Sequence, residues 1–188
     1  EFFAHYPEFF SQDSRRNRAL APVTALTQDR KHRECASSEE VRGKTVLDLG
    51  SCLAATGHWV LAQGALHYTG VELQPGMVEV SRQLLSRHWP QDRWQIHQQD
   101  LVEFLTLSQE TWDVVLILGS LYAFLDTVGV LTRLQARARE LIVIESTYPH
   151  CTAEPRSRII ELARRQQINS EIAAHDWEGA AARPSPGA

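Results

Sequence analysis

Short apolar runs alternate with longer amphipathic stretches along the middle of the chain. The apolar runs have the length and the β-branched content of buried strands. The stretches between them repeat apolar residues at helical spacing. The expected strands cover residues 45–49, 68–72, 94–97, 112–118 and 141–145, and the expected helices between them cover 57–63, 75–85, 102–107 and 128–139. This alternation predicts βαβ units, and therefore a parallel sheet with helices on both faces.

The two ends of the chain differ from this core. Aromatic residues among the first ten positions recur at helical spacing and predict a helix, or a pair of helical turns, that ends near Pro22. A last helix is expected from Pro155, because apolar residues after it follow the helical period. The expected boundaries are a single domain at 1–176, with an N-terminal helical segment at 1–40 and a core at 41–147, followed by a flexible tail at 177–188.

Composition narrows the class of protein. The 188 residues have a formal net charge of −4, which provides no general attraction to nucleic acid or to an anionic membrane. The three cysteines lie far apart without a CxxC pair, so we expect neither a disulfide framework nor a metal site, and a reducing, cytoplasmic location fits. No apolar run approaches the roughly 20 residues that span a bilayer.

Residues that could carry chemistry gather where the expected strands end. Gly50, Glu72, Asp100, Gly119 and Glu145 each follow or close one of these strands. Since the carboxyl ends of parallel strands share one edge of a sheet, we expect these five residues around one crevice. Small residues after the first strand allow a ligand to approach the backbone closely, and a carboxylate such as Glu72 accepts hydrogen bonds from ribose hydroxyls. The edge therefore predicts a site for a nucleoside cofactor.

The first loop differs from a dinucleotide fingerprint. Asp48 stands two residues before Gly50 and the next glycine is Gly57, so the GxGxxG spacing is absent. A carboxylate in that place repels a pyrophosphate but not a cofactor that carries a cation or an amine. A nicotinamide-dependent oxidoreductase is therefore the weaker hypothesis.

Four segments resemble the motifs of class I S-adenosylmethionine-dependent methyltransferases. They are Val46–Gly50, Gly70–Arg82 with Glu72 in the ribose-binding place, His97–Asp100, and Trp112–Tyr122. The resemblance extends over roughly residues 41–147. It implies an α/β fold with a doubly wound, Rossmann-like, mainly parallel sheet of about five strands in the order 3-2-1-4-5. It also implies S-adenosylmethionine as cofactor and S-adenosylhomocysteine as product.

The resemblance also implies roles for individual residues. Tyr122 is the candidate that positions the acceptor or the cofactor, and His150 is the candidate base, since its ordinary pKa lies near neutrality. Further candidates on the acceptor side are Glu145, Tyr148, His5 and Tyr6. The cofactor-binding candidates are Asp48, Gly50, Ser51, Cys52, Gly57, Glu72, Leu73, Gln99, Asp100, Leu101 and Gly119. No metal ligand is expected, because the histidines show no ligand spacing.

Two features depart from the family pattern. Cys52 and Ala54 stand where the motif DxGxGxG has its later glycines. The family's sheet also ends with an antiparallel strand pair, whereas the residues after Glu145 read as a helix and a tail. We therefore expect the last two strands to be missing and the open edge to favour a second chain or domain that completes the sheet.

Several of these assignments have structural alternatives. Asp100 could serve only as the cap of the helix that follows it. Asp48 could serve only to fix the loop through backbone hydrogen bonds. The charge balance favours a small-molecule acceptor over nucleic acid, and a non-catalytic module that keeps the fold to bind a partner stays open as the alternative to an enzyme.

Overall fold

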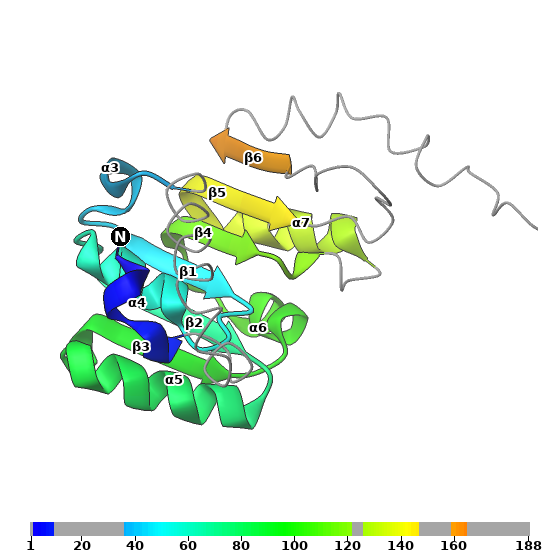
Figure 1. Cartoon of the computed structure of the whole chain (residues 1–188). Helices are drawn as coiled ribbons and strands as arrows, with labels where there is room; N and C mark the ends of the chain where they lie inside the picture. The colour runs from blue at the N-terminus through cyan, green and yellow to red at the C-terminus, as the bar shows by residue number, and fades with distance from the viewer. Residues whose placement is uncertain (1, 10–35, 122–125, 147–158, 165–188) are drawn as a thin grey trace, which may run out of the picture.

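The computed structural model describes residues 2–9, 36–121, 126–146 and 159–164 (Figure 1). Its centre is a six-stranded sheet in the order β3-β2-β1-β4-β5-β6. The strands are β1 (Thr45–Leu49), β2 (His67–Glu72), β3 (Trp94–Gln98), β4 (Trp112–Leu118), β5 (Ala138–Ser146) and β6 (Ile159–Arg164). The first five run parallel, which confirms the expected Rossmann-like sheet and its order 3-2-1-4-5.

The sixth strand corrects the prediction for the end of the chain. β6 pairs antiparallel with β5, from Leu141 opposite Arg164 to Ser146 opposite Ile159. The sequence predicted a helix here and no further strand. That prediction rested on apolar spacing alone, which does not reveal that the edge of β5 offers a row of backbone donors and acceptors. The chain's own β6 therefore occupies the edge that we expected a second chain or domain to complete.

Helices cover both faces of the sheet, as the alternating pattern predicted (Figure 1). One face carries α4 (Ala55–Ala62) and α5 (Pro75–His88), together with the N-terminal turns η1 (Phe3–His5) and η2 (Pro7–Phe9). The other face carries α6 (Leu101–Leu107) and α7 (Thr127–Arg137). The short elements α3 (Ser38–Val41) and η3 (Gln91–Arg93) precede β1 and β3.

Strand β4 shows why the two faces need two cores. Val114 and Leu116 pack into the core beneath α4 and α5, whereas Val115 and Ile117 pack into the core beneath α6 and α7. Successive side chains of a strand point to opposite faces, so a strand covered on both faces is apolar throughout. This double burial explains the continuous apolar run that identified β4 in the sequence.

The N-terminal aromatic segment forms two short turns and no longer helix within residues 2–9. Phe3 and Phe9 are buried against the core of α4 and α5, so this segment packs as part of the domain. Its expected end near Pro22 and the expected tail at 177–188 lie outside the described residues.

Candidate functional site

The loop after β1 is tied to the end of the neighbouring strand β2. The backbone N–H groups of Gly50 and Ser51 both donate to the carbonyl oxygen of Val71, at 2.9 and 3.0 Å. The parallel register sets this contact, since Leu49 lies opposite Val71. The first residues of the loop therefore lie beside Glu72, which ends β2.

Three residues of this loop adopt the left-handed conformation at alternate positions. Gly50, Cys52 and Ala54 have φ values of 78°, 50° and 59°. Cys52 and Ala54 are the only non-glycine residues with positive φ in the described part of the chain. A non-glycine residue in this region costs about 1–2 kcal/mol, so tertiary contacts have to hold the loop in place. The two residues that replace the family's glycines thus adopt a backbone conformation that favours glycine.

Glu72 faces this loop with both carboxylate oxygens engaged. Its Oε2 accepts from the backbone N–H of Cys52 at 3.0 Å, and its Oε1 accepts from the backbone N–H of Gln74 at 2.9 Å. Glu72, the last residue of β2, and the turn that begins at Gly50 therefore lie at the same part of the carboxyl edge of the sheet. The ribose role of Glu72 remains a prediction, but the adjacency on which it depends is present.

The thiol of Cys52 lies at the exposed surface of the loop. Desolvation raises the pKa of this thiol above its ordinary value of 9.0, and the negative charges of Glu72 and Asp48 raise it further. The thiol is therefore protonated at neutral pH, which makes it a poor nucleophile.

Asp48 is buried beneath the loop and is 2% exposed. Its Oδ2 accepts from the hydroxyl of Tyr68 at 2.9 Å. Complete burial, followed by the charge of Asp48 and the hydrogen bond to it, holds the pKa of Tyr68 well above 10. Tyr68 therefore stays a donor at any physiological pH and fixes the orientation of the Asp48 carboxylate.

Two glycines make room for the Tyr68 side chain. A Cβ atom at Gly57, within α4, would overlap the Tyr68 ring, and one at Gly70 would lie 3.0 Å from its hydroxyl oxygen. Packing against Tyr68 therefore explains the glycine at residue 57 without reference to any ligand. The sequence did not identify Tyr68 as a site residue. The signal that could have found it is the pair of glycines against its side chain, Gly57 in α4 and Gly70 in β2, but their contact with Tyr68 is known only from the folded structure.

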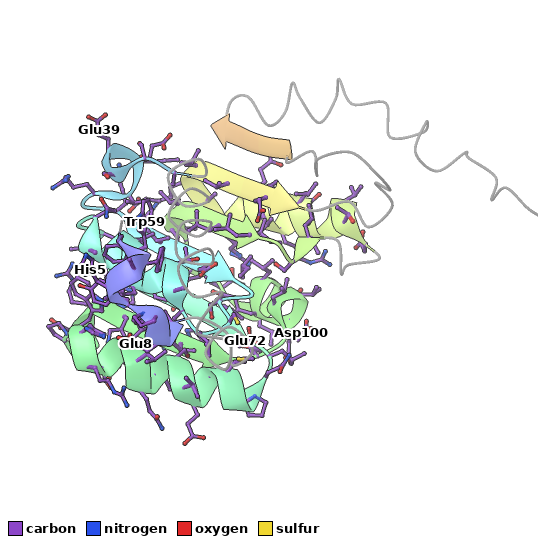
Figure 2. All side chains as sticks on the ribbon, in the orientation of Figure 1. His5, Glu8, Glu39, Trp59, Glu72 and Asp100 are labelled. Carbon is purple, nitrogen blue, oxygen red and sulfur yellow. The ribbon has the colours of Figure 1, made fainter. Side chains whose placement is uncertain are left out.

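The segment after β3 lies at the same edge of the sheet. Asp100 caps α6, because its Oδ1 accepts from the backbone N–H groups of Val102 and Glu103 at 2.9 and 3.0 Å. Gln99 donates its backbone N–H to the carbonyl oxygen of Glu72 at 3.1 Å, which joins the ends of β2 and β3. Figure 2 shows Glu72 and Asp100 near one another at this end of the molecule. Leu73 is 61% exposed beside them.

The segment after β4 closes on the first loop from the other side. The hydroxyl of Ser120 donates to the carbonyl oxygen of Leu49 at 3.2 Å, and a Cβ atom at Gly50 would lie 3.1 Å from that hydroxyl. Gly119 is left-handed, with a φ of 77°, and donates its N–H to the carbonyl oxygen of Glu145 at 2.7 Å. Glu145 itself is buried, so the end of β5 also holds an acid.

The remaining candidates on the acceptor side do not all gather at this edge. Tyr6 packs on His58, with ring centroids 4.2 Å apart, on the face of α4. Figure 2 shows His5 on the opposite side of the molecule from Asp100, so His5 does not reach the edge. Tyr122, Tyr148 and His150 lie outside the described residues.

The described residues contain no group of three or more His, Cys, Asp or Glu side chains that could hold a metal ion. They also contain no helix with the length and hydropathy needed to cross a bilayer.

Comparisons with known proteins agree with this geometry. By fold, the chain is similar to a candidate RNA methyltransferase from Pyrococcus horikoshii (TM-score 0.56, 16% identity, 82% of this chain and 68% of that one). It is also similar to magnesium protoporphyrin IX methyltransferase from Synechocystis with bound S-adenosylmethionine (0.57, 14%, 79% and 66%) and to an S-adenosylmethionine-dependent methyltransferase from Mesorhizobium loti (0.54, 20%, 70% and 62%). The chain thus spans about two thirds of the length of these proteins.

No curated protein matches the sequence significantly. A family model described as "Methyltransferase domain" matches residues 46–141, just over half of the chain, from β1 into β5. The match contains the loop at Gly50, Glu72, Asp100 and Gly119. The chain therefore belongs to the methyltransferase domain family.

Proposed function

We propose that this protein binds S-adenosylmethionine and transfers its methyl group to an acceptor. The observation that carries the proposal is the contact between the Glu72 carboxylate and the backbone N–H of Cys52. It joins an acid that can accept hydrogen bonds from ribose to a backbone loop that a ligand can approach. Family membership and the S-adenosylmethionine bound to a methyltransferase of similar fold support the same assignment.

The residues at the edge fit an adenosyl sulfonium. A carboxylate has about four acceptor positions, and each oxygen of Glu72 uses one, so positions remain for two ribose hydroxyls. The Asp48 carboxylate beneath the loop suits a cationic amino group and opposes a pyrophosphate. The further contacts that we propose for the cofactor are Gly50, Ser51, Cys52, Gly57, Leu73, Gln99, Asp100, Leu101 and Gly119.

When bound, S-adenosylmethionine would supply an electrophilic methyl group on a sulfonium: the acceptor's nucleophile would attack the methyl carbon in line, and S-adenosylhomocysteine would leave with the electron pair of the broken carbon–sulfur bond. The role of the protein is to orient the reactants, and ideal alignment alone lowers the activation barrier of such a reaction by about 7–11 kcal/mol. Glu72 holds the nucleoside, while the segment at Gly119 and the buried Glu145 border the acceptor side. A protein base is needed only where the acceptor must lose a proton. Tyr122 and His150 remain our candidates for that side.

We propose a small molecule as the acceptor. The net charge of −4 gives the chain no general attraction to a polyanion. The proteins of similar fold are named for acceptors as different as RNA and a magnesium porphyrin, so the fold does not select among acceptors. The residues at the ends of β4 and β5 would then determine which acceptor binds.

Calorimetric titration with S-adenosylhomocysteine tests the proposal, with NADH as the competing ligand. We expect heat from the first ligand and none from NADH. Glu72→Ala should weaken binding by about 5–150-fold, which corresponds to the 1–3 kcal/mol of a lost hydrogen bond to a charged group. The exposed acid of α5 provides the matched control, Glu79→Ala, which should bind as the wild type does. No heat from the wild type at high ligand concentration would favour a non-catalytic partner-binding module, and unchanged affinity in a folded Glu72→Ala would refute the ribose assignment.

A further inference from the structure

Two backbone N–H donors hold the Glu72 carboxylate. They come from segments on either side of it, Cys52 in the loop after β1 and Gln74 at the start of α5. Backbone N–H groups move less than side chains do, so the carboxylate has a fixed orientation. A ligand that binds Glu72 then does not have to immobilise this side chain, and the entropic cost of binding falls.

The donor at Cys52 depends on a strained conformation. Cys52 has a φ of 50°, and in this conformation its N–H donates to Glu72 Oε2 at 3.0 Å while the chain turns on toward Ala54. The surrounding contacts enforce this conformation, because Gly50 and Ser51 are bonded to Val71 and the N–H of Ala54 donates to the carbonyl oxygen of Ser51 at 2.8 Å. Ala54 is fully buried, which anchors the far end of the loop.

We propose that Cys52 is a positioning residue for the cofactor site: through its left-handed backbone it orients Glu72, and the ease with which residue 52 adopts that conformation sets the affinity for the adenosyl ligand. This inference rests on the proposed function, since it treats Glu72 as the residue that binds the nucleoside. It assigns the role to the backbone of Cys52 and none to its thiol, whose raised pKa keeps it protonated at neutral pH.

A substitution series at residue 52 separates the backbone from the side chain. Asn and Gly adopt positive φ readily, whereas a β-branched residue does so only as an outlier. By calorimetry, Cys52→Asn and Cys52→Gly should therefore bind S-adenosylhomocysteine within about threefold of the wild type, and Cys52→Val about tenfold or more weaker. Wild-type affinity in Cys52→Val would overturn the proposal, as would an affinity that follows side-chain polarity and ignores backbone preference.

Gln74→Pro gives a second, sharper perturbation. Gln74 has a φ of −79°, which proline adopts without change, so this variant removes the N–H that donates to Oε1 and keeps the φ of residue 74. It should also weaken binding of S-adenosylhomocysteine. Because both variants act through Glu72, neither should weaken binding further when combined with Glu72→Ala. Additive losses in these double variants would overturn the proposal.

If Glu72→Ala binds S-adenosylhomocysteine too weakly for its affinity to be measured, the contact between Cys52 and Glu72 can still be tested through the free energy of unfolding. Urea unfolding of Cys52→Val, Glu72→Ala and their combination forms a double-mutant cycle. We expect the combined loss of stability to be smaller than the sum of the two single losses, and strict additivity would overturn the contact itself. A wild type that does not bind S-adenosylhomocysteine would instead overturn the proposed function, which distinguishes the two failures.

Discussion

The buried histidine of α4 gives the most direct quantitative prediction. His58 is 2% exposed, and its ring stacks on Phe9 with centroids 4.4 Å apart and planes inclined by 9°. Its Nδ1 accepts from the indole N–H of Trp89 at 2.9 Å. Only a ring without a proton on Nδ1 can accept this bond, so the fold requires the neutral imidazole.

The environment of His58 opposes protonation. Burial, followed by the charge of the nearby His88, whose ring centroid lies 4.8 Å away, lowers the pKa of His58 from 6.5 to about 4. At 1.36 kcal/mol per pKa unit, this difference corresponds to about 3 kcal/mol of stability. Tyr6 packs on the same ring, and the carboxylate of Glu8 pairs with His88 at 3.1 Å.

The direction of the pH dependence follows from the lowered pKa. Below pH 6.5 the unfolded chain takes up a proton at this residue, while the folded protein does not until about pH 4. The contribution of His58 is therefore complete above pH 6.5 and is lost as the pH falls from 6.5 to 4. Acid should weaken the packing of the N-terminal turns on α4 first, because Phe9 and Tyr6 contact the ring directly.

Urea unfolding at pH 7.5, 6, 5 and 4.5 measures this loss, with tryptophan fluorescence and circular dichroism as probes. His58→Asn removes the titration and keeps an acceptor near the position of Nδ1. We expect the free energy of unfolding of the wild type to fall relative to His58→Asn by most of the 3 kcal/mol across this range. His5→Asn, at an exposed position, should keep the wild-type slope. Parallel pH profiles for wild type and His58→Asn would refute the reasoning.

Three further expectations concern the loop and its support. Tyr68→Phe removes the hydroxyl that donates to buried Asp48, so the free energy of unfolding should fall by about 1–3 kcal/mol and the affinity for S-adenosylhomocysteine should fall with it; unchanged values for both would contradict the pairing. Gly57→Ala places a methyl group against the Tyr68 ring and should cost about 1–3 kcal/mol in urea unfolding, whereas Gly76→Ala, which faces open space, should be tolerated. Alkylation of Cys52 by iodoacetamide, in a variant whose other two cysteines are serine, should rise with pH and reach half its maximum above pH 9; a midpoint below 8 would contradict the raised pKa.

The strands could be predicted from the sequence because most of their buried positions are occupied by apolar residues. β4 begins at Trp112 and ends at Leu118 in both the pattern and the structure, since every residue of the strand except Asp113 packs against one of the two cores. The helix expected from Pro155 was wrong at residues 159–164, because apolar spacing describes one segment, whereas strand pairing depends on a segment elsewhere in the chain. Strand β6 exists through its partner β5.

The sequence predicted where the candidate site lies in the fold, but it did not predict most of the contacts within the site. The ends of the strands located Gly50 and Glu72 correctly beside one another, since parallel topology requires it. The pairing of Asp48 with Tyr68 was not predictable, because it joins two buried side chains from adjacent strands whose faces are known only after folding. Tyr6, which the sequence offered as a candidate on the acceptor side, packs on His58 of α4 in the structure.

The departure from the glycine pattern also becomes intelligible from the topology. Strands β1 and β2 are neighbours with Leu49 opposite Val71, so the chain after β1 must turn next to Glu72 whatever residues it contains. Glycine makes that turn easily, but the turn itself is enforced by the bonds of Gly50 and Ser51 to Val71 and by the carboxylate that receives the N–H of Cys52. Cys52 and Ala54 can therefore replace glycine at a conformational cost that these contacts offset. It follows that a methyltransferase loop is better identified by the acid that ends the neighbouring strand than by a count of its glycines.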